Sequence, residues 1–125
     1  MLSLPSAVRI YLGTQPADMR RSFDGLAFLV QQFLQSDPLS GHLFVFRNKA
    51  GDRIKVLFWD GDGYVIYYKR LEKGTFRFPT GSGASVTVRA ADLTMLLDGV
   101  DLTSVRRRQR YQLPQRPTSV PTAKQ

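Results

Sequence analysis

The chain has 125 residues, no cysteine and a formal net charge of +8. This length suits one small domain with a single modest core, and the missing cysteines exclude disulfides and thiolate metal sites. The first residues lack a basic segment followed by an apolar one, and no apolar stretch reaches the roughly 18 residues that cross a bilayer. We therefore expect a cytoplasmic protein with no membrane partner.

The charge is distributed unevenly. Residues 1–105 contain 12 Lys and Arg against 10 Asp and Glu, whereas residues 106–125 contain 6 basic residues and no acidic one. We therefore predict a single domain over 1–105 and a basic tail over 106–125 that is disordered when free. A polyanion such as DNA is the expected partner, because Lys and Arg neutralise phosphates. The alternative is a tail that only aids solubility or contacts an acidic protein.

The first third of the chain predicts one strand and one helix. Residues 7–12 alternate in polarity, which indicates a strand ending at Gly13. Ser22 is placed to cap a helix with Asp24 in its first turn. Apolar residues then follow at helical spacing: Phe23, Leu26, Ala27, Val30, Phe33 and Leu34. The helix should end before Pro38 and bury this stripe against a sheet.

The segment IKVLFWDGDGYVIYYKRLEKGTFRFP, residues 54–79, predicts an antiparallel hairpin. Its turn is Asp60-Gly61-Asp62-Gly63, because glycines and small polar residues permit tight loops. This turn sets the pairs Trp59 with Tyr64, Phe58 with Val65, Leu57 with Ile66, Val56 with Tyr67, Lys55 with Tyr68, Ile54 with Lys69 and Arg53 with Arg70. Residues 43–47 extend the sheet if 48–51 form a loop, which would pair Val45 with Ile54, Phe46 with Arg53 and Phe44 with Lys55.

One face of this predicted sheet is basic and aromatic. It carries Phe44, Phe46, Arg53, Lys55, Tyr68 and Arg70. Such a face can stack bases and follow phosphates. Alternatively, a helix covers it and the long basic side chains reach its edge. Arg53 opposite Arg70 is repulsive unless an anion or acid intervenes, so this pair indicates either a ligand site or a wrong register.

The last elements are a short strand over 85–89 and a helix over 93–97 that Asp92 caps and Gly99 ends. Together these elements predict an α+β fold. We expect a mainly antiparallel sheet of about five strands, packed by one longer helix and a short C-terminal helix and followed by the basic tail.

The sequence offers little for catalysis. His42 is the only histidine and has no cysteine beside it, so a surface role is favoured over a general base. Asp60 and Asp62 lack the remaining ligands of a calcium loop, since Tyr64 and Leu71 stand at its fifth and twelfth positions. Nothing in the spacing of the carboxylates requires the convergence that a two-metal nuclease needs. We expect no enzyme activity, no metal and no cofactor.

Three segments resemble a known family. They are PADMRRSFDGL (16–26), the hairpin string above and the later LLDGVDL. They are similar to the TnpB, or Orf2-like, accessory proteins of bacterial transposable elements of the insertion sequence 66 family, which usually have Lys-Gly where this chain has Arg21-Ser22. The resemblance implies a small protein encoded beside a separate transposase, needed for efficient transposition and not credited with strand transfer. Matching positions, with no catalytic role attached, are Asp18, Met19, Arg20, Phe23, Asp24, Trp59, Asp60, Tyr68, Lys69, Arg70, Leu71 and Phe76.

The leading hypothesis is a non-enzymatic accessory protein that binds DNA for the transposase. The expected nucleic-acid-binding residues are Arg53, Lys55, Tyr68, Lys69, Arg70, Arg106, Arg107, Arg108 and Arg110. The alternative is a protein interaction module that docks onto the transposase through Trp59 and Tyr64, aided by Leu57 and Ile66, without touching DNA.

Overall fold

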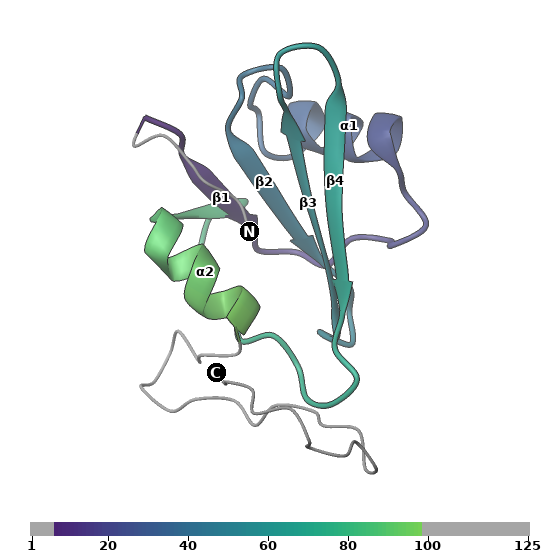
Figure 1. The fold of residues 1–125 in the computed structure, drawn as a ribbon, viewed down its shortest axis with the longest axis vertical. Coiled ribbons are helices and arrows are strands. Elements are labelled where there is room, and N and C mark those ends of the chain that lie inside the picture. The colour runs from purple at the N-terminus through teal and green to yellow at the C-terminus, as the bar shows by residue number, and fades with distance from the viewer. Residues whose placement is uncertain (1–6, 99–125) are drawn as a thin grey trace, which may run out of the picture.

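A computed structural model describes residues 7–98 as a five-stranded sheet with two helices (Figure 1). The elements in chain order are β1 (Ile10–Gly13), α1 (Phe23–Gln32), β2 (Leu43–Arg47), β3 (Arg53–Trp59), β4 (Tyr64–Arg70), β5 (Ser85–Val88) and α2 (Ala90–Asp98). The strand order is β4-β3-β2-β1-β5. Among the strands of residues 7–98, only β1 and β2 pair in parallel, and the other pairs are antiparallel. The predicted α+β class with a mainly antiparallel sheet is confirmed.

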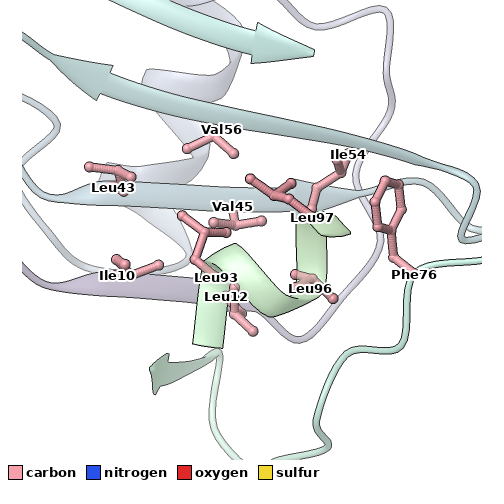
Figure 2. Close-up of a cluster of buried hydrophobic side chains, with 10 residues drawn as sticks. All are labelled: Ile10, Leu12, Leu43, Val45, Ile54, Val56, Phe76, Leu93, Leu96 and Leu97. Atoms are coloured by element: carbon pink, nitrogen blue, oxygen red, sulfur yellow. The ribbon is translucent and has the colours of Figure 1, made fainter. Parts of the chain in front are cut away.

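The two helices pack on opposite faces of the sheet, so the central strand β2 is buried on both sides (Figure 1). On one face, Leu26 and Val30 of α1 meet Phe44, Phe46 and Leu57. On the other face, α2 closes the cluster drawn in Figure 2, formed by Ile10, Leu12, Leu43, Val45, Ile54, Val56, Phe76, Leu93, Leu96 and Leu97. The expected burial of the α1 stripe holds for Leu26 and Val30, whereas Phe23 and Phe33 stay largely exposed.

The predicted register of the β3–β4 hairpin is confirmed at all seven pairs, from Arg53 opposite Arg70 to Trp59 opposite Tyr64. The loop closes through a hydrogen bond from the Asp60 amide to the Gly63 carbonyl, 3.1 Å long. Gly61 has φ of +111°, a conformation that L side chains rarely adopt. The residue types in the turn, above all its glycines, thus determine the register of β3 and β4.

The predicted β2–β3 register is wrong by two residues. Val45 pairs with Val56, and Phe46 pairs with Lys55. The reason is a longer loop: Asn48 Oδ1 accepts hydrogen bonds from the amides of Gly51 and Arg53, at 2.9 and 3.0 Å, so that the loop includes residue 52. Because the shift is an even number, every side chain remains on its predicted face.

The helix ends differ from the predictions in their capping groups. Ser22 precedes α1, but its side chain makes no capping hydrogen bond. The second helix begins earlier than predicted, at Ala90, and Asp92 lies in its first turn. The Asp92 carboxylate accepts a hydrogen bond from the Arg89 amide at 3.1 Å, which, with further contacts to Arg89, holds its pKa below the usual value.

The connection between β4 and β5 depends on a glycine. A Cβ on Gly81 would overlap with Cγ2 of Val86, whereas a Cβ on Gly83 would have 3.8 Å to its nearest neighbour. We expect Gly81→Ala to lower the free energy of unfolding by about 1–3 kcal/mol, because the connection must move away from β5. Gly83→Ala, the matched control, should change it by less than about 1 kcal/mol. Equal urea midpoints for the two variants would contradict this packing.

Candidate nucleic-acid interface

The basic aromatic face of the sheet is the side that α1 covers. Lys55 is buried there, with 7% of its surface exposed. Its ammonium donates hydrogen bonds to the carbonyls of Met19 and Arg21, each 2.8 Å long, and lies 4.6 Å from the centre of the Tyr68 ring. Lys55 therefore fixes the segment that precedes α1, and its ammonium is directed into the protein rather than toward a surface ligand.

Lys69 projects from the opposite face of the same hairpin. Its ammonium donates a 2.8 Å hydrogen bond to the carbonyl of Leu97 in the last turn of α2. A cation at this position also interacts favourably with the negative end of the helix dipole. Lys55 thus holds the segment before α1, and Lys69 holds the last turn of α2.

The remaining predicted DNA-binding residues of the hairpin gather where β3 begins and β4 ends. Arg53 donates a 3.1 Å hydrogen bond to the Tyr68 hydroxyl, and Arg70 donates a 3.0 Å hydrogen bond to Glu72. These separate partners explain how Arg53 and Arg70 stand opposite each other in the sheet. Tyr68 is 46% exposed and Arg70 is also exposed, so this group presents a ring and a guanidinium to solvent.

The predicted partner-binding residues lie at the other end of the hairpin, about 20 Å away by strand rise. The rings of Trp59 and Tyr64 meet edge to face with centroids 5.2 Å apart. Tyr64 packs against the α1 cluster, and burial raises the pKa of its hydroxyl. Leu57, expected to join this docking surface, is fully buried beneath α1 and belongs to the core. That part of the hypothesis is wrong because α1 occupies the face.

Before α1, the chain forms a turn centred on an ion pair. The Asp18 carboxylate accepts hydrogen bonds from the Arg20 amide at 2.9 Å and from its guanidinium at 2.8 and 3.1 Å. The side-chain hydrogen bonds of Arg20, followed by its amide, lower the pKa of Asp18 from 3.8 to about 2. The same segment carries the two carbonyls that Lys55 binds.

The ion pair between Asp18 and Arg20 should make the stability of the protein depend on pH. Because the folded pKa lies below the ordinary value, the stabilisation is present above pH 3.8 and is lost as the pH falls toward about 2. Arg20→Gln should raise the pKa of Asp18 toward 3.8 in a carboxyl-carbon NMR titration. Arg21→Gln, the control, removes a neighbouring charge but none of the hydrogen bonds to Asp18, and should leave most of the shift. Similar Asp18 titrations in the unmodified chain and Arg20→Gln would contradict this interpretation.

Two hollows in the surface were not predicted from the sequence. A basic pocket of about 510 Å³ lies where β1 and β2 end. Its lining includes Arg47, Lys49, Arg77, Phe76 and Phe78. A second, apolar hollow of about 400 Å³ lies beside α1 and includes Leu29, Phe33, Leu34 and Phe46. The sequence signal for the basic pocket is Arg77-Phe78-Pro79, but placing it beside Arg47 requires the tertiary fold.

The remaining predictions concern the tail arginines, His42, metal binding and membrane spans. Arg106, Arg107, Arg108 and Arg110 lie outside the described residues. His42 accepts a 3.0 Å hydrogen bond from the Arg9 amide through Nδ1, so this nitrogen has a structural use. Between residues 7 and 98 there is no group of three or more His, Asp or Glu side chains that could hold a metal ion. In the same range, neither helix is long and apolar enough to span a bilayer.

Residues 7–98 thus form a small α+β fold in which basic side chains surround a mixed sheet. The family model described as IS66 Orf2 like protein matches residues 8–107. The chain belongs to this family, which confirms the resemblance inferred from its motifs. The family is associated with an accessory role in transposition and is not a known class of enzyme.

Two relatives come from Sinorhizobium fredii (strain NBRC 101917 / NGR234). The uncharacterized protein y4hO is 42% identical over 100 residues, which cover 78% of this chain and 87% of that protein. The uncharacterized protein y4jC is 38% identical over 108 residues, which cover 86% of this chain and 92% of that protein. No solved structure matches the chain.

Proposed function

We propose that the protein is a non-enzymatic accessory factor that binds DNA during transposition of its element. The observation that carries this proposal is the charge asymmetry: residues 106–125 contain 6 basic residues and no acidic one. Membership in the IS66 Orf2-like family supplies the process, and the basic tail supplies the physical means of contacting DNA.

The hairpin adds a second contact in this proposal. Arg53, Tyr68 and Arg70 present cations and an exposed ring at one end of the sheet, where they can meet a phosphate or an unpaired base. Lys55 and Lys69 act indirectly, because their ammonium groups hold the segments before α1 and at the end of α2. The tail then supplies affinity and the hairpin supplies orientation.

A second candidate function is docking onto the transposase without direct DNA contact. It is favoured by exposed aromatic side chains in and beside α1, since Phe23, Phe28 and Phe33 are 44%, 49% and 62% exposed. The Trp59–Tyr64 pair at the hairpin tip would extend such a surface. Aromatic anchors of this kind are common in protein interfaces.

A pull-down with the element's transposase separates the two functions. The purified chain and the transposase are mixed with element DNA, and half of the sample is treated with nuclease before washing. The DNA-binding proposal predicts that the complex is lost after nuclease treatment. A complex that survives nuclease treatment, together with no DNA retained by the purified chain alone, supports the docking function and contradicts the proposal.

A further inference from the structure

The basic pocket lies at the carboxyl ends of the only parallel strand pair among residues 7–98. Gly13 ends β1, Arg47 ends β2, and both line the pocket. The loop after β2 and the segment 75–81 complete the wall. In open α/β sheets, ligands bind in the crevice beyond the carboxyl ends of the parallel strands, and this pocket has the same position relative to β1 and β2. The volume of about 510 Å³ is also within the range of small-molecule sites.

All charged side chains in the pocket lining are basic. The lining includes Arg47, Lys49 and Arg77 and no acidic side chain. Lys49 and Arg77 are exposed, and neither forms a hydrogen bond or ion pair within the range 7–98. Two cations on different loops thus face one hollow without a carboxylate to neutralise them. An anion is the ligand that such a site favours.

Arg47, unlike Lys49 and Arg77, is fixed by hydrogen bonds within residues 7–98. Its guanidinium donates hydrogen bonds to the carbonyls of Thr14 at 3.1 Å and Asn48 at 3.4 Å. Its Cζ lies 5.8 Å from the centre of the Phe78 ring, and this ring packs partly into the core. The pocket therefore contains a fixed guanidinium beside an aromatic ring, and both groups are surfaces on which a base can stack.

We propose that this pocket binds one unpaired nucleotide of a DNA strand. Lys49 and Arg77 neutralise its phosphate, and the base lies against Phe78 and the neighbouring Arg47. A base that is paired and stacked inside a duplex cannot enter the pocket, because it would first have to leave the base stack. The inference rests on the proposed DNA-binding function and gives it a preference for unpaired DNA.

The test uses the full chain and fluorescence anisotropy with a labelled oligothymidine strand and a labelled duplex. Lys49→Gln with Arg77→Gln should lower affinity for the strand at least about tenfold, since both the phosphate contact and the base position are lost. The matched control is Arg9→Gln with Lys73→Gln, which removes the same charges from exposed positions outside the pocket lining. Thermal unfolding of both variants checks that the fold is retained.

The inference holds if the pocket variant loses much more affinity for the strand than the control does, while the two variants bind the duplex alike. Equal losses in both variants overturn the pocket and leave general electrostatic binding by the tail intact. If the unmodified chain binds neither DNA, the proposed function fails and this inference fails with it.

A second measurement addresses the base without removing charge. Phe78→Leu keeps an apolar side chain against the core and removes the ring beside Arg47. The unmodified chain should prefer oligothymidine over an abasic strand by about fivefold or more, and Phe78→Leu should lose this preference. Equal affinity of the unmodified chain for both strands overturns the nucleotide assignment.

Discussion

Replacing Arg106, Arg107, Arg108 and Arg110 together with Ala should weaken DNA binding at least about tenfold at low salt. Each arginine that neutralises a phosphate releases counterions on binding. The slope of log affinity against log salt should therefore become shallower by about 0.9 for each duplex phosphate contact that is lost. Anisotropy titrations over a salt series measure both quantities.

The matched control replaces the same four arginines with Lys. It keeps the charge and removes the planar guanidinium, so the salt slope should stay close to that of the unmodified chain. A shallow slope in the Lys variant would assign the contacts to the guanidinium geometry instead of charge. Unchanged affinity and slope in the Ala variant would contradict the role of the tail.

The second large effect is expected from Lys55→Met. This change keeps an unbranched apolar side chain of similar length and removes the ammonium that binds the carbonyls of Met19 and Arg21. Hydrogen bonds to charged groups contribute about 1.5–3 kcal/mol, so the free energy of unfolding should fall by about that amount. Urea unfolding measures the loss, and the segment before α1 should show faster amide hydrogen exchange.

Tyr68→Phe is the control for Lys55→Met. It keeps the ring near the ammonium and removes only the exposed hydrogen bond with Arg53. Its effect on stability should stay below about 0.5 kcal/mol. If both variants unfold at the same denaturant concentration, the structural role of Lys55 is wrong. If Lys55→Met instead lowers DNA affinity in proportion to the lost charge and leaves stability unchanged, Lys55 contacts DNA directly.

The sequence was most informative where a local turn determines the structure. The residues Asp60 to Gly63 determine the loop, and all seven β3–β4 pairs follow from it. The loop between β2 and β3 depends instead on the Asn48 side chain, which binds the amides of Gly51 and Arg53, and each β2 residue pairs with β3 two residues later than predicted. Alternation of side chains still placed Phe44 and Phe46 on the correct face, because a shift of two residues preserves it.

The site was less predictable because it depends on contacts between distant segments. The hairpin pattern places Lys55 beside Tyr68, but only the path of residues 19–21 buries its ammonium. The basic pocket likewise requires the parallel pairing of β1 with β2, which brings Thr14 and Arg47 together near the segment 75–81. Strand order is a non-local property, and the spacing of residues within single elements does not encode it.

The most direct test of DNA binding without cutting is an anisotropy titration of the purified full chain with labelled single-stranded and duplex oligonucleotides in dilute buffer, followed by a salt series and gel analysis of the DNA. We predict binding that weakens steeply as salt is added, with both oligonucleotides recovered intact. Failure to bind either oligonucleotide in dilute buffer would contradict the proposal.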